Sequence, residues 1–479
     1  MDSWLMLTGG QVIDGLGNAP VVAQSVLIKN DRIDAIGESA SFDRVPRGDR
    51  LEVIDTTGKT VMPGLIDMHT HISFGEARTQ EEQDLYSSVE SRSLLAAWNA
   101  QKVLRAGVTS ASAPGGSWNI GVAVRDAIKG GYVVGPRMTS AAQFISTSNG
   151  IANYYPSWVG APKSSTGVIV DSRDAMVAEV RRQVKDGVDF VKIGDSVDGG
   201  FQAFSYDELA AMAAMAHQLG KKIAIHARGG SAVADAVRAE FDWIMHGDRM
   251  NEDDAAALAD SGIPLCPTVT MVANFAQLGH VAGMPPARQE RAGIMLERIA
   301  KALTMAHEAG ATFLMGTDSG FAATPFGEWH ARELELLCSL AGLSPLEAIK
   351  SATSNAAFAF DQEGTLGQIS EGAVADVLIV DGDPLSDIRV LQDKERLTVI
   401  QGGAVVAFTP EAEDPDRRWS HDRAMTITRD LITQDAVRAY EEGVPVPDRP
   451  ASPLYSTRDE AGEMVRQFDQ LGREARLPE

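Results

Sequence analysis

The chain has 479 residues, 44% of them hydrophobic and 23% charged, which is the composition of an ordinary globular protein. Its 43 Lys and Arg against 66 Asp and Glu give a formal charge of -23, which repels phosphate backbones and anionic bilayers. We therefore expect neither nucleic acid nor a membrane as partner. Two cysteines, Cys266 and Cys338, and an N-terminus without a basic region or long apolar run favour a cytoplasmic protein without disulfides.

Short runs of alternating apolar and polar residues fill the first part of the chain and return late in it. Examples are residues 24–29 (QSVLIK) and 375–380 (ADVLIV). Alternation with a period of two predicts β-strands. We expect the two flanks, residues 1–62 and 363–408, to form one small split β-sandwich domain.

The middle of the chain, residues 63–362, alternates short apolar runs with amphipathic helical stretches, which is the pattern of repeated βα units. The candidate strands are residues 65–71, 108–111, 137–141, 190–194, 222–227, 243–246, 264–268 and 312–317. Eight strands in about 300 residues match the size of a (β/α)8 barrel. The predicted fold is therefore α/β, a TIM barrel carrying the split sandwich.

After the second flank the chain becomes polar and rich in proline. Residues 409–479 are expected to form a C-terminal extension with helical stretches near 429–442 and 457–474. We assign this extension to surface packing or to a contact between subunits.

Polar side chains close several of the predicted strands, and one lies within a strand. They are His69, His71, Lys192, His226, His246 and Asp318. Active sites of such barrels lie at the C-terminal ends of the strands, so we expect these groups to converge. His69 and His71 are two residues apart and point the same way along a strand, and imidazole is a common metal ligand. The pattern predicts a metal site.

Each of these residues has a plain structural interpretation when it is taken alone. Lys192 would be a lysine whose amine reaches the surface, His226 and His246 would be core histidines, and Asp318 would cap a helix. Their joint occurrence with the His-x-His pair, at the ends of successive strands, favours the metal interpretation.

The same motifs resemble those of a known superfamily. They are, in chain order, residues 63–71 (PGLIDMHTH), His226, His246 and residues 316–318 (GTD). They are similar to the amidohydrolase superfamily, over about residues 4–405. Residues 343–349 (LSPLEAI) and 372–380 (GAVADVLIV) resemble its imidazolonepropionase-like branch, which includes Xaa-Pro and Xaa-Arg dipeptidases, ochratoxin-cleaving amidases, and phenylurea and molinate hydrolases.

The resemblance implies a centre of two divalent metal ions bridged by a carbamate. It assigns His69, His71 and Asp318 to one metal, His226 and His246 to the other, and a carboxylated Lys192 to both. Zinc is the default, with Mn, Co or Fe also suited to such ligands. The two metals would share a hydroxide that attacks a carbonyl, with Asp318 as general base and then general acid. The resemblance also implies a homo-oligomer.

Five residues beyond the metal ligands are expected to meet the substrate. Arg228, two residues past His226, would polarise a carbonyl or hold an anionic group, as an alternative to a surface salt bridge. His330 follows the eighth strand closely enough to line the mouth as a catalytic or binding group. Asn149, Tyr154 and Tyr155 belong to the loop after the third strand. Peptidase-like relatives often carry a Gly-Gly-His turn here, which residues 149–151 (NGI) lack.

These features predict a metal-dependent hydrolase of carbon–nitrogen bonds other than peptide bonds. The expected substrate is a small, hydrophobic amide, urea or carbamate, as in phenylurea and thiocarbamate hydrolases. The alternatives are an amidase on N-acyl amino acids, an Xaa-Pro-type dipeptidase and a mononuclear deaminase. A deaminase does not use the lysine of the fourth strand. Non-enzymatic relatives usually lack the metal ligands that this chain retains.

Overall fold

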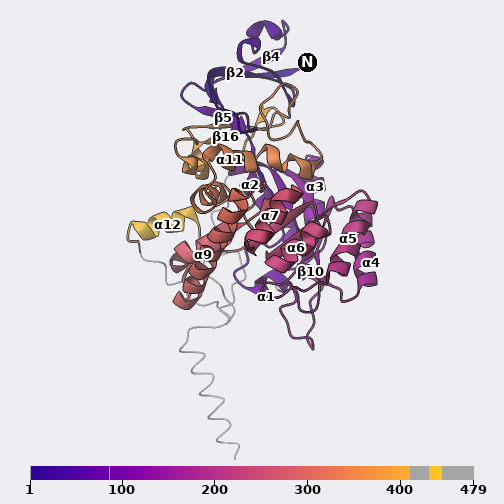
Figure 1. The fold of residues 1–479 in the computed structure, drawn as a ribbon. Helices are drawn as coiled ribbons and strands as arrows, with labels where there is room; N and C mark the ends of the chain where they lie inside the picture. The colour runs from indigo at the N-terminus through magenta and orange to yellow at the C-terminus, as the bar shows by residue number, and fades with distance from the viewer. Residues whose placement is uncertain (1, 86, 410–430, 445–479) are drawn as a thin grey trace, which may run out of the picture.

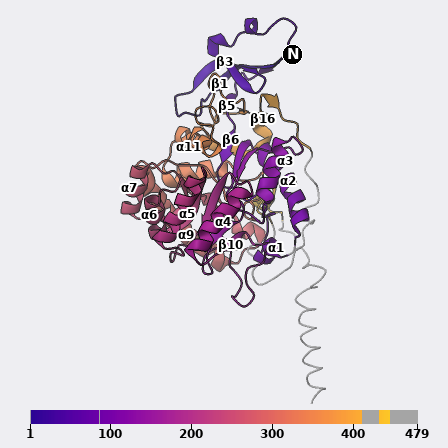
Figure 2. The ribbon, with the colours of Figure 1, turned by 90° about the vertical axis from the view of Figure 1, so that its right-hand side faces the viewer.

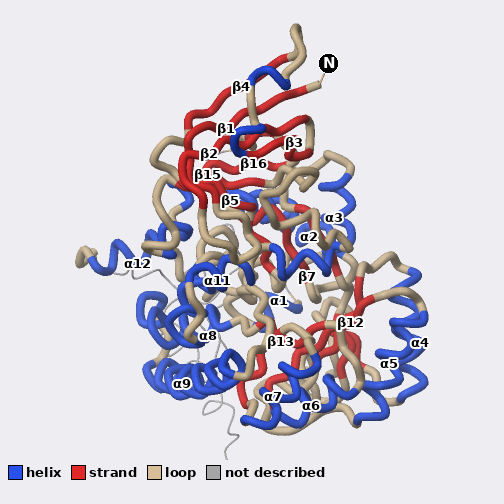
Figure 3. The backbone as a smooth tube through the Cα atoms, turned by 45° about the horizontal axis from the view of Figure 1, so that its top comes forward, coloured by secondary structure: helices blue, strands red, loops and turns tan. Residues whose placement is uncertain are grey.

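A computed structural model describes residues 2–85, 87–409 and 431–444 of the chain. It shows two parts stacked end to end, a small part made mostly of strands and a larger body in which helices surround strands (Figures 1 and 3). The N-terminus lies in the small part, at the end that is farthest from the larger body.

Strands from both flanks of the chain meet in the small part, as one eight-stranded sheet with the order β17-β16-β15-β5-β1-β2-β3 and β4 paired with β1. The bounds are β1 Ser3–Val12, β2 Val21–Lys29, β3 Arg32–Ile36, β4 Arg50–Asp55, β5 Thr60–Pro63, β15 Val377–Val380, β16 Leu397–Gln401 and β17 Ala404–Val405. We expected a sandwich of two sheets, whereas the strands of the small part are hydrogen-bonded into one sheet. Pairing of Leu378 with Met62 joins the late flank to the strand that leads into the body.

The body contains two parallel sheets, with the orders β6-β7-β8 and β10-β9-β11-β12-β13-β14. Their bounds are β6 Leu65–Asp67, β7 Val108–Ala113, β8 Arg137–Ser140, β9 Phe144–Ser146, β10 Gly167–Ile169, β11 Phe190–Gly194, β12 Lys222–Gly229, β13 Trp243–Arg249 and β14 Leu265–Cys266. Most residues of these strands are buried, including the polar ones of β7, because both faces of the sheets are covered.

Backbone hydrogen bonds link the two parallel sheets on both sides. Residues 312–319 lie between β14 and β6, where the Leu314 N–H donates to the Leu265 carbonyl at 2.8 Å and the Met68 N–H donates to the Met315 carbonyl at 2.9 Å. On the other side, the Asp189 N–H donates to the Ser140 carbonyl at 2.9 Å. Over the described residues the strands therefore surround a common centre, but their hydrogen-bond pairing is interrupted. The closed barrel expected from the sequence is thus confirmed only in part.

The predicted strands differ from the observed ones mainly at their ends. Residues 190–194 form a strand with the predicted bounds, whereas the first strand ends at Asp67, before the His-x-His pair. Residues 312–317 form one isolated bridge, between Phe313 and Leu265, and no named strand. The three-residue strands β9 and β10 were not predicted, because so short a run carries no readable periodicity.

Helices cover the outside of the body, and Figure 2 shows α4, α5, α6 and α7 in succession along it. The helices are α1 Gln80–Asp84, α2 Val89–Arg105, α3 Ile120–Lys129, α4 Arg173–Lys185, α5 Tyr206–Gln218, α6 Gly230–Arg238, α7 Glu252–Ser261, α8 Val269–Leu278, α9 Pro286–Glu308, α10 Arg332–Leu336, α11 Pro345–Ser351 and α12 Gln434–Glu441. α12 falls within the helical stretch predicted near 429–442, and the stretch near 457–474 lies outside the described residues. No described helix has both the length and the apolar character needed to cross a bilayer.

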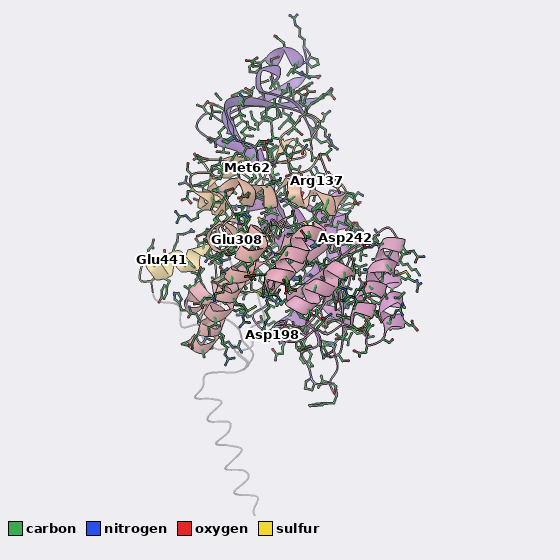
Figure 4. All side chains as sticks on the ribbon, in the orientation of Figure 1. Met62, Arg137, Asp198, Asp242, Glu308 and Glu441 are labelled. Carbon is green, nitrogen blue, oxygen red and sulfur yellow. The ribbon has the colours of Figure 1, made fainter. Side chains whose placement is uncertain are left out.

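The strands of the body run away from the small sheet. Met62 and Arg137, at the entrances to β6 and β8, lie near the small sheet, and Asp198, in the loop after β11, lies at the opposite end (Figure 4). The C-terminal ends of the parallel strands therefore open on the side far from the small sheet, and the predicted site residues follow these ends.

Candidate metal centre

Three predicted ligands, His69, His71 and Asp318, meet at one buried point. The Nε2 atoms of the two histidines are 3.0 Å apart, and Asp318 Oδ1 lies 3.0 Å from His71 Nε2 and 3.4 Å from His69 Nε2. One ligand atom from each residue lies within 4.8 Å of the others. The Nδ1 atom of His71 is 2.9 Å from the Gly115 carbonyl, which only accepts, so Nδ1 carries the proton and Nε2 offers its lone pair.

The backbone brings these three residues together although the first strand ends before them. The His71 N–H donates to the Ser319 carbonyl at 2.7 Å, and Thr70 bridges Ser319 in parallel. Gly316 allows this approach, because a Cβ there would lie 2.9 Å from His69 Cβ. Asp318 itself has a φ of 56°, a left-handed conformation that is strained for a residue with a side chain.

The second predicted pair of ligands, His226 and His246, lies beside the first group. Their ring centroids are 4.2 Å apart, and the His246 ring lies 5.4 Å from that of His69. They come from neighbouring parallel strands, where Ala227 pairs with His246. His226 Nε2 is 3.0 Å from the Ser196 carbonyl, whereas His246 Nε2 is buried without a hydrogen-bond partner. Burial lowers the pKa of both rings well below 6.5, so both are neutral.

Lys192 is buried in the middle of β11, near both groups of ligands. Its Nζ contacts the sulfur of Met245. Burial lowers the pKa of this amine from 10.5 to about 7, against the opposing effect of the Asp318 carboxylate. A substantial fraction is therefore neutral at neutral pH, and a neutral amine is the form that reacts with carbon dioxide to give a carbamate. The residue thus fits the bridging role that the resemblance implied.

Arg228 lies at the same edge, and its charge is balanced by a partner that sequence reasoning missed. Its guanidinium forms an ion pair with Asp248, and both residues are buried. Burial raises the pKa of Asp248, while Arg228 opposes that rise. His226-Ala-Arg228 and His246-Gly-Asp248 follow the same i, i+2 pattern on neighbouring strands, and this repeat was the available signal.

The predicted loop residues divide between the mouth and the surface. Tyr154 is 38% exposed, yet burial raises the pKa of its hydroxyl, and the carboxylates of Asp84 and Asp318 add to the rise. Tyr154 therefore lies within electrostatic reach of the centre. Tyr155 instead lies beside Asp84, where its hydroxyl lowers the pKa of that carboxyl. Asn149 is exposed, and its Oδ1 accepts a hydrogen bond from Thr147 at 2.9 Å.

His330 is buried, and both of its ring nitrogens are used within the protein. Nε2 accepts the Gly327 N–H at 3.1 Å, and Nδ1 lies 2.8 Å from Asp67 Oδ2. This arrangement favours a supporting role over the substrate contact predicted from its place after the eighth strand. Asp67 was within the quoted motif, but its function as the partner of His330 was not foreseen.

The chain matches the amidohydrolase family over residues 60–406. Ochratoxinase of Aspergillus niger is 26% identical to it over 415 residues, which cover 81% of this chain and 83% of that protein. Imidazolonepropionase of Rubrobacter xylanophilus is 27% identical over 402 residues, which cover 74% and 84% respectively.

Solved structures with the same fold include a Xaa-Pro dipeptidase with bound methionine in its active site. It has a TM-score of 0.74 and 26% identity, and the match covers 84% of this chain and 99% of that one. Molinate hydrolase and phenylurea hydrolase B have TM-scores of 0.70 and 0.69 at 20% and 23% identity, with 86% and 84% of this chain and 98% and 96% of theirs covered, a likeness of fold alone. These neighbours indicate a TIM barrel with an additional domain.

Proposed function

The chain belongs to the amidohydrolase family and fits its imidazolonepropionase-like branch. On this premise we propose that it is a hydrolase with two metal ions, which cleaves the carbonyl C–N bond of a small, neutral, hydrophobic amide, urea or carbamate. The observation that carries the proposal is the convergence of His69, His71 and Asp318 on one buried point. The hydrolase class follows from the family, and the metal pair and substrate are the proposed parts.

The residues present fit a metal pair. His69, His71 and Asp318 would hold one ion, His226 and His246 the other, and the carbamate of Lys192 both. The buried Nε2 atom of His246, which has no hydrogen-bond partner, is free for such a bond. Zinc suits these ligands, as do Mn, Co and Fe. When bound, the ions would supply an activated water and polarise the carbonyl of the substrate.

Asp318 is the group that moves the proton. Burial opposes its ionisation, yet its pKa lies below the usual value of 3.8, and the cationic Arg228 is among the groups that lower it. The carboxylate is therefore available to take a proton from the attacking water and to pass it to the leaving nitrogen.

The charge balance at the mouth favours a neutral substrate. Arg228 is already paired with the buried Asp248, so the charge of its guanidinium is compensated before any substrate arrives. Tyr154 adds an aromatic face within reach of Asp318. A phenylurea, anilide or thiocarbamate meets these conditions without the cost of burying an additional carboxylate.

An amidase for N-acyl amino acids, or an Xaa-Pro-type dipeptidase, is the second candidate. It is favoured by the 26% identity to ochratoxinase and to the Xaa-Pro dipeptidase, since the relatives named for neutral substrates are less similar. In this case the carboxylate of the substrate would compete with Asp248 for Arg228.

Matched substrates separate the two candidates. The metal-loaded enzyme is assayed on a phenylurea, an anilide, a thiocarbamate and an Xaa-Pro peptide, and on one N-acyl amino acid beside its neutral carboxamide. We expect kcat/KM to favour the neutral member of the last pair, and Arg228→Lys to change that preference little. The second candidate would be established if the enzyme preferred the N-acyl amino acid to its carboxamide, and if this preference were lost in Arg228→Met and kept in Arg228→Lys. Turnover of none of these compounds would overturn the proposed function.

A further inference from the structure

A buried histidine, His330, lies in the turn that leads into α10, and it contacts a carboxylate next to the half of the metal centre formed by His69, His71 and Asp318. The Nε2 atom of His330 accepts a backbone N–H, from Gly327, and a backbone N–H only donates. Nε2 therefore carries no proton, the ring is neutral, and its single proton lies on Nδ1. Nδ1 donates that proton to Asp67 Oδ2 at 2.8 Å.

Asp67 connects this histidine to the ligands. Its carboxylate also accepts the His69 N–H at 2.9 Å, the Thr317 N–H at 3.2 Å and the Thr317 hydroxyl at 2.6 Å. One fully buried carboxylate thus ties the end of β6 to the residue that precedes Asp318. The distance between His69 and Asp318 depends on this carboxylate remaining in place.

Glu333, three residues after His330, performs a similar task for α8. Its carboxylate accepts the Val269 N–H at 2.9 Å, the Thr270 N–H at 2.8 Å and the Thr270 hydroxyl at 2.6 Å. The first N–H groups of a helix have no partner within it, and negative charge is favourable there. A fully buried glutamate from another helix therefore supplies the cap of α8.

This cap leaves Thr268 free to hold a metal ligand. Thr268 would ordinarily bond the first N–H groups of α8, but its Oγ1 lies 2.6 Å from His246 Nδ1. Its φ of 56° and ψ of 46° are strained for a β-branched residue. The hydrogen bonds of Glu333 to the next two residues offset that strain. Thr268 in turn orients the ring whose Nε2 faces the centre.

We propose that His330 and Glu333 are positioning residues, one for each half of the metal centre, so that a single turn of chain sets the geometry of both. The residues are three apart and therefore lie on the same side of that turn. His330 acts through Asp67 on His69 and Asp318, and Glu333 acts through Thr268 on His246. This inference rests on the proposed metal-dependent function.

The first test uses the effect of His330 variants on metal binding. His330→Asn places an amide N–H near the position of Nδ1 and keeps the donor to Asp67, whereas His330→Phe keeps the ring and loses both hydrogen bonds. We expect the affinity for the first metal, measured by competition with a chelator, to fall about 10- to 100-fold in His330→Phe and to recover largely in His330→Asn. The visible spectrum of the Co(II) form should change in His330→Phe alone.

The second test uses the branch through Glu333. Glu333→Gln replaces an acceptor by a donor that faces two N–H groups, and Thr268→Val removes the hydroxyl. Both should lower the affinity for the second metal about 10- to 100-fold and leave the first metal bound. Thr268→Ser, which keeps the hydroxyl, should bind both ions as the wild type does. The Thr268 pair remains informative if Glu333→Gln does not fold.

Metal binding separates this inference from the proposed function. Folded His330→Phe, Glu333→Gln and Thr268→Val with wild-type affinities and Co(II) spectra would overturn the positioning roles, whatever the substrate. A wild-type enzyme that binds two metals but hydrolyses no amide, urea or carbamate would overturn the proposed function and leave the positioning roles intact. A wild type that binds no metal would overturn both.

Discussion

The two halves of the candidate metal centre differ in how closely the folded chain, without metal, brings their ligand atoms together. In the half formed by His69, His71 and Asp318, the ligand atoms lie 3.0–3.4 Å from one another. In the half formed by His226 and His246, His226 Nε2 faces the Ser196 carbonyl, and the amine of Lys192, the proposed bridge between the halves, contacts Met245. The first half is organised by hydrogen bonds of the chain. The second depends on chemistry at Lys192, and we expect it to bind its metal more weakly.

The largest effect is expected at Asp318, in the organised half. Asp318→Asn removes the carboxylate that we propose as general base and acid, and kcat should fall about 10²- to 10⁴-fold. Steady-state kinetics at saturating metal measure it, with Asp198→Asn, an exposed acid of the β11 loop, as the matched control. More than a tenth of the wild-type kcat in Asp318→Asn would show that another residue is the base.

A smaller loss is expected at Lys192, the proposed bridge between the halves. Lys192→Ala would remove the proposed carbamate, so metal analysis should show a fall from two ions per chain to one, with the ion at His69 and His71 retained. Activity should fall about 100-fold. A short carboxylic acid such as propionate, which supplies two oxygens in the space left by the side chain, should restore part of the metal and of the activity. Two tightly bound ions without added acid would contradict the bridging role.

A third prediction concerns Asp84, a buried carboxyl outside the metal centre. It tests whether a buried charge there costs stability. Burial raises its pKa from 3.8 to about 6, so its favourable contribution to folding is complete below pH 3.8 and is lost as the pH rises through 6. Asp84→Asn should therefore raise the free energy of unfolding at pH 8 by about 1–3 kcal/mol, and by much less at pH 4. Denaturant titrations at the two pH values measure this difference. An equal shift at both would place the effect in packing.

The smallest effect is expected at Ile432, which supports the loop that follows Asp318. Its side chain is fully buried against Ala323 and Trp329, and its carbonyl accepts the Trp329 indole N–H at 2.6 Å. Ile432→Val should lower the free energy of unfolding by about 0.5–1.5 kcal/mol and leave the metal content unchanged. The exposed Val444, changed to Ala, is the control. A loss of the first metal in Ile432→Val would show that the C-terminal segment helps to arrange the organised half.

Sequence patterns predicted the strands that carry ligands better than their ends or their closure. The run that ends in Gly194 predicted the bounds of β11 because a strand covered on both faces is largely apolar, and here Lys192 is its one charged residue. The run at residues 312–317 looked equally strand-like, but its backbone hydrogen bonds to β14 involve Leu265 alone, and on the other side one joins it to Met68, just past β6. Periodicity describes which faces are buried, and it does not specify which neighbour completes a ladder.

The candidate ligands of the proposed centre could be named from the sequence. Histidines, a lysine and an aspartate at the ends of successive strands define the available ligands, and the i, i+2 spacing of His69 and His71 directs two rings to one point. These properties are local or repeat with the βα unit, so composition and spacing are enough to state them.

The partners of the buried polar groups around the centre became clear only from the tertiary structure. His330 was assigned to the substrate from its place in the chain, yet it donates to Asp67, which is 263 residues away. Arg228 looked available to an anion until Asp248 was found beside it. Hydrogen-bond partners of buried polar groups are chosen by three-dimensional packing, because each such group must be satisfied by whatever the fold brings near it. The sequence therefore determined which side chains are candidates for the chemistry, and only the folded chain determined what holds them in position.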